Sequence, residues 1–137
     1  MKYVSVAVDG PAGSGKSTIT KMVAKSLGFN YVDTGAMYRA LTFNFLSNGL
    51  DELEEEKIKE LLSKTDFKVE YVDGVQYVYV NDEEVSDKIR TAEVSKFTSL
   101  FAKSPAVRDF LIVTQRNLAN TNNIIMDGRD IASVVLP

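Results

Sequence analysis

The sequence contains no cysteine and no histidine, and these absences exclude several kinds of chemistry. Without cysteine there is neither a disulfide framework nor a thiolate metal site. Without histidine, no imidazole can serve as a catalytic base or as a metal ligand. No apolar run approaches the roughly 20 residues that span a membrane, and no cluster of Lys and Arg favours a nucleic-acid backbone as the main partner. We therefore expect a cytoplasmic protein with no membrane partner and no nucleic-acid partner.

What is present is the composition of an ordinary globular protein. The 137 residues are 45% hydrophobic and 26% charged, and the formal net charge is −3. This length is enough for a compact domain with a real core. We find no internal repeat and no low-complexity segment, so the motifs and the apolar spacing carry the interpretation.

Apolar spacing over the first fifty residues predicts the order β-α-β-α. Residues 3–8 have the pattern of a buried parallel strand, and residues 16–27 carry one apolar helical stripe that ends at Gly28. Residues 29–32 form a short second strand, and Asp33-Thr34-Gly35 opens a helix that runs to about Ser47. This alternation is typical of a parallel sheet with crossover helices.

The stretch from residue 50 to residue 103 changes character. An acidic segment leads into a helix that ends near Ser63, and residues 67–80 form a hairpin around the turn signal Asp73-Gly74. Thr91 can cap a further helix. Because antiparallel strands are unexpected in a parallel sheet, we predict an inserted subdomain over residues 50–103, with a core made of residues 1–49 and 104–137.

The last part of the chain returns to the core pattern. Ser104 followed by Pro105 is a helix start, with the cap residue before a proline at the first helical position. Asn122-Asn123 ends that helix, and residues 124–126 form a third strand of the parallel sheet. This strand ends at Asp127.

Residues 10–17 fit the nucleotide-phosphate loop pattern G-x-x-x-x-G-K-[ST] in full, between a predicted strand and a predicted helix. Backbone N–H groups of such a loop point at phosphate oxygens, Lys16 can reach the terminal phosphates, and the Ser17 hydroxyl can hold Mg²⁺. The alternative is a glycine-rich turn that only caps a helix. We predict that the ATP phosphates are bound by Gly10, Pro11, Ala12, Gly13, Ser14, Gly15, Lys16, Ser17 and Thr18.

Asp127 and two arginines are the further candidates for this site. An apolar strand that ends in Asp is typical of the second motif of phosphate-loop proteins, where the carboxylate binds Mg²⁺ through water or orients the loop hydroxyl. Only five arginines stand against eleven lysines, and bidentate phosphate recognition needs a guanidinium. Arg39 and Arg129 follow predicted strands, and ligands of open α/β sheets bind at strand carboxyl ends. The alternatives are a plain Asp-Gly turn and solvated surface charges.

Several stretches together resemble the bacterial cytidylate kinase family: Asp33 to Arg39, Ile89-Arg90-Thr91, Pro105 to Arg108, Gln115-Arg116 and Asp127-Gly128-Arg129-Asp130. The resemblance runs from residue 3 to residue 137. It implies an α/β fold, in which a phosphate-loop nucleoside-monophosphate-kinase core has a parallel sheet flanked by helices. It also implies an inserted α/β subdomain that contains the antiparallel hairpin.

The resemblance further implies that ATP phosphorylates CMP and dCMP with Mg²⁺, in a monomeric enzyme. Lys16, Arg39 and Arg129 would be the catalytic residues, and both arginines would hold the CMP phosphate. Thr34 would lie near the acceptor nucleotide, while Ser99, Arg108 and Asp130 would read cytosine. Ser17 and Asp127 would hold the metal. Helix capping is the alternative for Thr34 and Asp130, and ordinary surface packing is the alternative for Ser99.

Members of this family continue past the position of Pro137 with further strands and an arginine-rich lid. We therefore expect a fragment truncated before the lid, so that the C-terminal part of the fold is missing and the activity belongs to the parent protein. Two other functions stay open. One is a different phosphate-loop kinase for a small molecule, and the other is a non-catalytic nucleotide-binding fragment.

Overall fold

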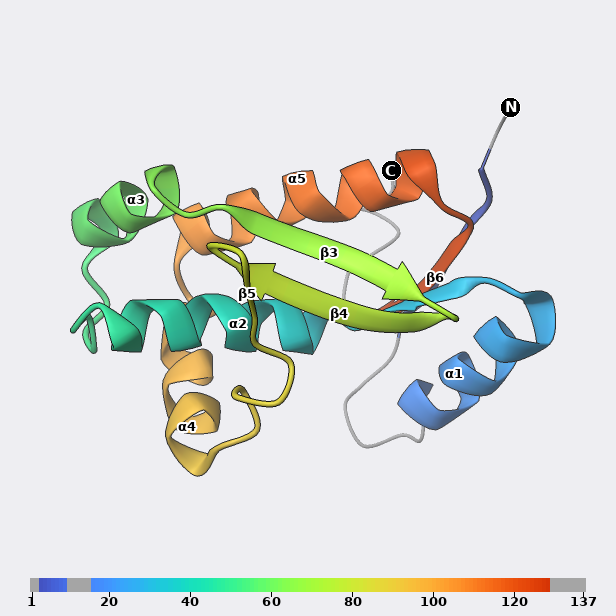
Figure 1. Cartoon of the computed structure of the whole chain (residues 1–137), viewed down its shortest axis with the longest axis horizontal. Helices are drawn as coiled ribbons and strands as arrows, with labels where there is room; N and C mark the ends of the chain where they lie inside the picture. The colour runs from blue at the N-terminus through green and yellow to red at the C-terminus, as the bar shows by residue number, and fades with distance from the viewer. Residues whose placement is uncertain (1–2, 10–15, 129–137) are drawn as a thin grey trace. The chain divides into compact units, whose positions relative to one another are not determined.

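The structure is a computed structural model, and it describes residues 3–9 and 16–128. Two compact units make up the chain: one comprises Met1–Thr34, Tyr71–Gln76 and Ile112–Pro137, and the other comprises Gly35–Glu70 and Tyr77–Leu111. The elements, drawn in Figure 1, are β1 (Ser5–Asp9), α1 (Lys16–Leu27), β2 (Asn30–Val32), α2 (Thr34–Ser47), α3 (Glu55–Ser63), β3 (Phe67–Val72), β4 (Val75–Val80), β5 (Glu83–Glu84), α4 (Ala92–Phe101), α5 (Pro105–Thr121) and β6 (Ile124–Gly128).

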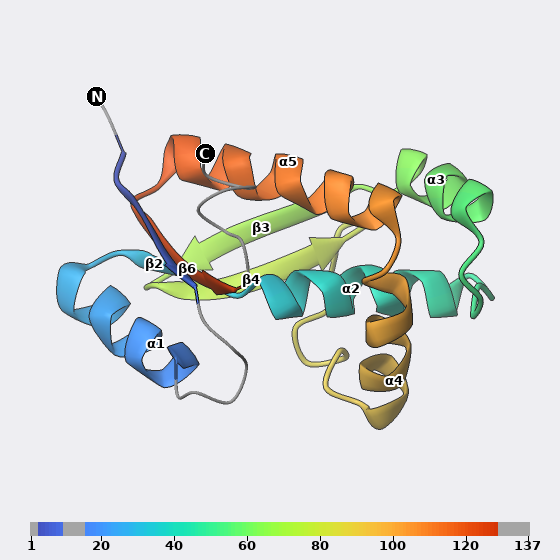
Figure 2. The same cartoon turned by 180° about the vertical axis from the view of Figure 1, so that it is seen from behind.

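The first unit contains a three-stranded parallel sheet in the order β1-β6-β2. Ser5 pairs with Ile124 and Asn30 pairs with the same residue from the other side, so β6 is the central strand (Figure 2). Helix α1 packs against β6 and β2. The predicted parallel sheet and its crossover helix are confirmed, and Ile124, Ile125 and Met126 are fully buried in it.

Helix α1 ends directly before Gly28, as the sequence predicted. Gly28 has a φ of 70°, in the left-handed region that favours glycine. Its N–H donates to the Lys25 carbonyl, and the Phe29 N–H donates to the Ala24 carbonyl at 2.9 Å. This pair of bonds satisfies two of the four carbonyls in the last turn of the helix and turns the chain into β2.

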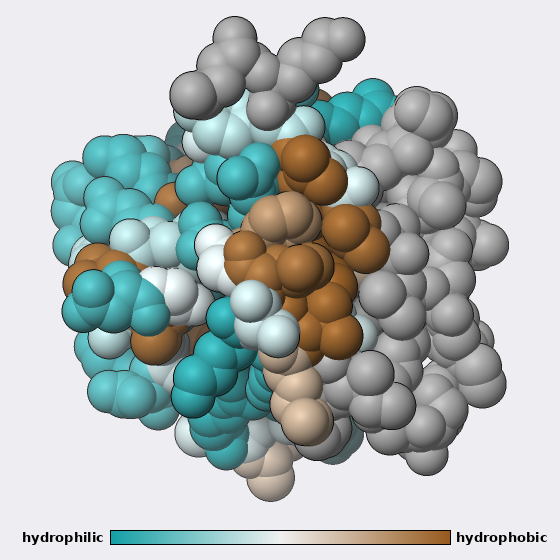
Figure 3. All heavy atoms as spheres, turned by 90° about the vertical axis from the view of Figure 1, so that its right-hand side faces the viewer, coloured by the Kyte–Doolittle hydropathy of each residue, from teal (hydrophilic) through white to brown (hydrophobic). Residues whose placement is uncertain are grey.

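Apolar side chains remain at the surface of this unit. Those with more than a third of their surface exposed are Tyr3, Val4, Met22, Val23, Leu27, Val72, Val75 and Val113. Brown atoms in Figure 3 mark surface-exposed hydrophobic residues. Within the described part of the sheet, β1 pairs with β6 alone, so the other edge of β1 has no strand partner.

The second unit contains most of α2 and most of an antiparallel sheet in the order β3-β4-β5, whose hairpin tip, Tyr71–Gln76, belongs to the first unit. Figure 1 shows β3 and β4 as one long hairpin. Asp73 and Gly74 at its turn both have positive φ, 54° and 78°, as a type I′ turn requires. The Asn81 N–H donates to the Asp66 carbonyl at 2.7 Å, which fits the register that the two-residue turn predicts. The hairpin is confirmed.

Two groups of apolar side chains form the core of this unit. Val78 and Val80 of β4 pack with Ala36 and Ala40 of α2 and with Val94 of α4. A second group is centred on Phe45 and Phe101, whose rings meet edge to face with centroids 4.9 Å apart. Both rings are fully buried.

The predicted caps of α4 and α5 are also confirmed. The Thr91 hydroxyl accepts from the Val94 N–H at 3.1 Å, and the Ser104 hydroxyl accepts from the Val107 N–H at 3.3 Å. No helix in the described ranges is both long enough and apolar enough to cross a bilayer. The division at residues 50 and 103 into core and inserted subdomain stays a prediction.

Candidate functional site

The carboxyl ends of the three parallel strands meet at one edge of the sheet. Val8 pairs with Asp127 and Asp9 pairs with Gly128, while Val32 at the end of β2 pairs with Met126. The chain leaves β1 directly into the predicted phosphate loop, and it leaves β2 directly into Asp33 and Thr34. The backbone therefore brings Asp9, Asp127 and Thr34 to the edge where ligands of parallel α/β sheets bind.

Several predicted residues of this site lie outside the described residues, namely Gly10, Pro11, Ala12, Gly13, Ser14, Gly15, Arg129 and Asp130. The backbone of Lys16, Ser17 and Thr18 forms the first turn of α1, and Asp127 belongs to β6, but the description does not extend to these four side chains. Their roles toward ATP and Mg²⁺ stay predictions. A hydroxyl and a carboxylate are oxygen donors of the kind that Mg²⁺ prefers.

A hydrogen-bond network surrounds the point where β2 passes into α2. The Gln76 Oε1 atom accepts from the Asp33 N–H at 3.0 Å, and Gln76 Nε2 donates to the Asp33 carbonyl at 3.2 Å. The Tyr71 hydroxyl donates to the same Oε1 atom at 2.8 Å. Burial raises the pKa of Tyr71 well above its ordinary value, and the charge of Asp33 acts in the same direction. The phenol therefore stays a protonated donor at neutral pH.

Arg39 lies in the second unit, on α2. Its Nη1 atom donates to the Ser95 hydroxyl of α4 at 2.5 Å. Ser99 follows Ser95 by one helical turn and thus shares its side of α4. Among the residues that the structure describes, no carboxylate forms an ion pair with Arg39. Within the described residues, no carboxylate therefore occupies the remaining N–H donors of the guanidinium, as suits an anion-binding group.

Arg108 of α5 acts on Tyr38, the neighbour of Arg39 in the sequence. Burial raises the pKa of the Tyr38 hydroxyl, and the positive charge of Arg108 opposes that rise. Arg108 is exposed, and it too has no ion pair with a carboxylate in the part of the chain that the structure describes. Of the predicted substrate residues, Arg39, Ser99 and Arg108 therefore belong to one compact unit.

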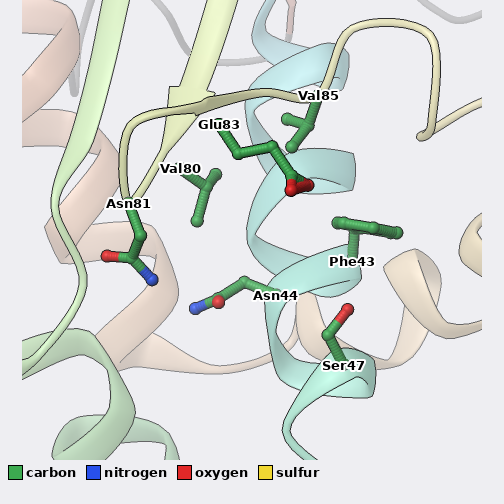
Figure 4. A pocket seen from close by; sticks show the side chains of 7 residues that line it. All are labelled: Phe43, Asn44, Ser47, Val80, Asn81, Glu83 and Val85. Atoms are coloured by element: carbon green, nitrogen blue, oxygen red, sulfur yellow. The ribbon is translucent and has the colours of Figure 1, made fainter.

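A cavity of about 270 Å³ also lies in the second unit, between α2 and the segment around β5 (Figure 4). Its lining consists of Phe43, Asn44, Ser47, Val80, Asn81, Glu83 and Val85. None of the predicted site residues is among them. The Asn44 amide is already bound to the Thr65 hydroxyl and the Asn81 Oδ1 atom to the Asp66 N–H, so much of the polar lining is internally satisfied.

A family model described as cytidylate kinase matches residues 6–137. The chain belongs to the cytidylate kinase family. This finding confirms the resemblance that the sequence motifs carry, and the α/β fold with a parallel sheet and an antiparallel hairpin agrees with it.

Curated cytidylate kinases are similar to almost the whole chain. The one from Caldicellulosiruptor bescii is 47% identical over 137 residues, which are 100% of this chain and 61% of that protein. The one from Leuconostoc mesenteroides is 50% identical with the same coverage. The one from Bacillus subtilis is 44% identical over 136 residues, which are 99% of this chain and 61% of that protein. The chain thus spans about 61% of the length of these relatives.

Two residues beside the candidate site of this cytidylate kinase family member could not be identified from the sequence. Ser95 meets Arg39 across 56 positions, and Gln76 meets Asp33 across 43 positions. Neither residue belongs to a motif, and no periodic pattern links such distant positions. Only the packing of α4 against α2, and of the hairpin tip against the end of β2, brings these pairs together.

Proposed function

We propose that this chain is part of an enzyme that transfers the terminal phosphoryl group of ATP to CMP and dCMP. The observation that carries the proposal is Arg39: its guanidinium rests on a serine hydroxyl, carries no carboxylate partner in the described part of the chain, and shares its unit with Ser99 and Arg108. A cationic fork of this kind suits the phosphate of a nucleoside monophosphate. Membership of the cytidylate kinase family supports the same activity.

The donor side of the reaction rests on the edge of the parallel sheet. We infer that residues 10–18 bind the ATP phosphates through backbone N–H groups and that Lys16 lies against the terminal phosphates. Ser17 and Asp127 would hold Mg²⁺. When bound, this ion neutralises charge on the phosphate oxygens.

On the acceptor side, Arg39 and Arg129 would hold the CMP phosphate, and Thr34 would lie beside the acceptor nucleotide. Ser99, Arg108 and Asp130 would bind the cytosine edge, which offers one amino donor and two acceptors. Phosphoryl transfer depends mainly on positioning and on charge neutralisation, so the absence of histidine and cysteine is compatible with this reaction. We also infer a monomer that acts in the cytoplasm.

Nucleotide binding to the chain tests this proposal directly. Isothermal titration with ATP, CMP, dCMP, UMP and AMP, each with Mg²⁺, is expected to give binding of ATP and preferential binding of the cytidine nucleotides. Lys16→Ala is expected to weaken ATP binding while leaving the far-UV circular dichroism unchanged. Asp130→Ala is expected to reduce the difference in affinity between CMP and UMP. Its effect on the affinity for ATP is expected to be smaller.

Other outcomes would support the competing functions. Binding of ATP together with no binding of any of the four nucleoside monophosphates would favour a kinase for another small molecule. Binding of ATP and CMP with no turnover in a coupled assay, in the intact protein as well as in the chain, would favour a non-catalytic nucleotide-binding protein. Absence of ATP binding would refute the proposal.

A further inference from the structure

Strand β2 is an edge strand in the described part of the parallel sheet. It pairs with β6 on one side, and no other strand lies along its second side. At Asp33, where β2 has just ended, the backbone N–H and the carbonyl are both bound by the side-chain amide of Gln76. A primary amide offers the same donor and acceptor as a peptide unit. Gln76 thus takes the place of a neighbouring strand for this one residue.

The orientation of the Gln76 amide is decided by its partners. The Asp33 N–H and the Tyr71 hydroxyl both donate to Oε1, at 3.0 and 2.8 Å. A flipped amide would direct its NH₂ group at the Asp33 N–H, which has no acceptor to offer. Gln76 is half-buried and lies two residues after the hairpin turn. Its backbone is fixed by the hairpin, and its side-chain amide is fixed by the bonds to Asp33 and Tyr71. The result is a fixed contact between the hairpin tip and Asp33.

We infer that Gln76 is a positioning residue for the acceptor nucleotide, which acts through the Asp33 backbone to fix Thr34 at the first position of α2. This inference rests on the proposed function, in which Thr34 lies beside CMP. Asp33 and Thr34 are consecutive, so the direction in which the chain leaves Asp33 sets where the Thr34 hydroxyl lies. A binding group must be held to within a fraction of an ångström by the residues behind it. Neither Gln76 nor Tyr71 needs to touch the nucleotide.

Variants at position 76 separate positioning from folding. Gln76→Met keeps the length and apolar volume of the side chain and removes both bonds to Asp33. Gln76→Glu keeps an acceptor for the Asp33 N–H and for the Tyr71 hydroxyl, loses the donor to the Asp33 carbonyl and adds a negative charge. Val75→Ala is the matched control, because Val75 is the neighbouring residue at the same hairpin tip and its side chain is exposed.

The measurement is the dissociation constant of CMP and of ATP, by calorimetry, for the 137-residue chain and each variant. Since a hydrogen bond contributes about 1 kcal/mol net, Gln76→Met is expected to raise the dissociation constant of CMP about five-fold. Its ATP affinity is expected to stay within about two-fold, and Gln76→Glu is expected to fall between wild type and Gln76→Met. Amide hydrogen exchange without nucleotide is expected to speed up at Asp33 in Gln76→Met and not in Val75→Ala.

Two results would overturn the inference. The first is an unchanged CMP affinity in Gln76→Met, and the second is an equal loss for CMP and ATP, which is the signature of a purely structural role. A wild-type chain that binds neither nucleotide would refute the proposed function, and this inference with it. A chain that binds both but shows either of the first two results would refute the positioning role alone.

Discussion

Replacing Glu55 with alanine is expected to destabilise the second unit by removing the anion that caps α5. The Glu55 carboxylate accepts from the Ser104 hydroxyl at 2.8 and 3.0 Å through its two oxygens, and from the Ala106 N–H at 2.8 Å. Ser104 is buried, and its hydroxyl in turn accepts from the Val107 N–H. Glu55 therefore completes a cap that reaches α5 from the first turn of α3.

The magnitude follows from the number of donors. A hydrogen bond to a charged group contributes about 1.5–3 kcal/mol, and two donors at the low end of this range suit a half-buried carboxylate. Truncation to alanine releases side-chain entropy worth about 1 kcal/mol, so a net loss of about 2 kcal/mol is expected. Glu55→Gln keeps an acceptor and loses the favourable charge at the helix N-terminus, so a loss of about 1 kcal/mol is expected.

Urea unfolding followed by circular dichroism measures both losses. With a denaturant dependence of about 2 kcal/mol per molar urea, Glu55→Ala lowers the midpoint by about 1 M. The control is Glu56→Ala, because Glu56 is the next residue, is exposed, and makes no hydrogen bond to the described part of α5. Equal midpoints for Glu55→Ala and Glu56→Ala would refute the reasoning.

Three further perturbations test other parts of the structure. Because the pKa of Tyr71 is raised in the folded chain, its phenol ionises first in the unfolded chain above about pH 10, and the free energy of unfolding falls as the pH rises. Tyr71→Phe is expected to reduce this alkaline loss of stability between about pH 8 and pH 11, and an unchanged pH dependence would contradict the reasoning. Phe101→Ala leaves a cavity beside Phe45 and is expected to cost about 3–5 kcal/mol in urea unfolding, whereas a loss below about 1 kcal/mol would contradict the edge-to-face core. Arg39→Lys keeps the charge but loses the planar guanidinium, so CMP is expected to bind about ten-fold more weakly while ATP binding is unaffected. Ser95→Ala is expected to weaken CMP binding less, and unchanged CMP binding in Arg39→Lys would exclude Arg39 from the site.

Local patterns in the sequence predicted most of the elements correctly. The helix end at Gly28, the hairpin turn at Asp73-Gly74 and the caps at Thr91 and Ser104 all depend on the conformational preference or the hydrogen bonding of residues a few positions apart. Such interactions form within one turn of chain, so the sequence alone records them. The motifs around Asp33 and Asp127 likewise indicated the family, which the comparisons confirm.

The cap of α5 shows what could not be predicted from the sequence. Ser104 was predicted as the cap of α5 and is one, but the charge that completes the cap comes from Glu55, 49 positions earlier. The acidic run around Glu55 indicated only the start of its own helix. Nothing in that run distinguishes Glu55 from Glu56.

The sequence by itself determined the order of the helices and of all the strands except β5, the phosphate-loop motif and the kinds of residue available for phosphate binding. Only the tertiary structure decided that β6 lies between β1 and β2, which gathers three strand ends at one edge. It also decided which partner holds each polar group: Ser95 for Arg39, Gln76 for Asp33, and Glu55 for the start of α5. The physical reason is that a hydrogen bond between distant residues needs the packing of whole elements first, and such packing leaves no periodic trace along the chain.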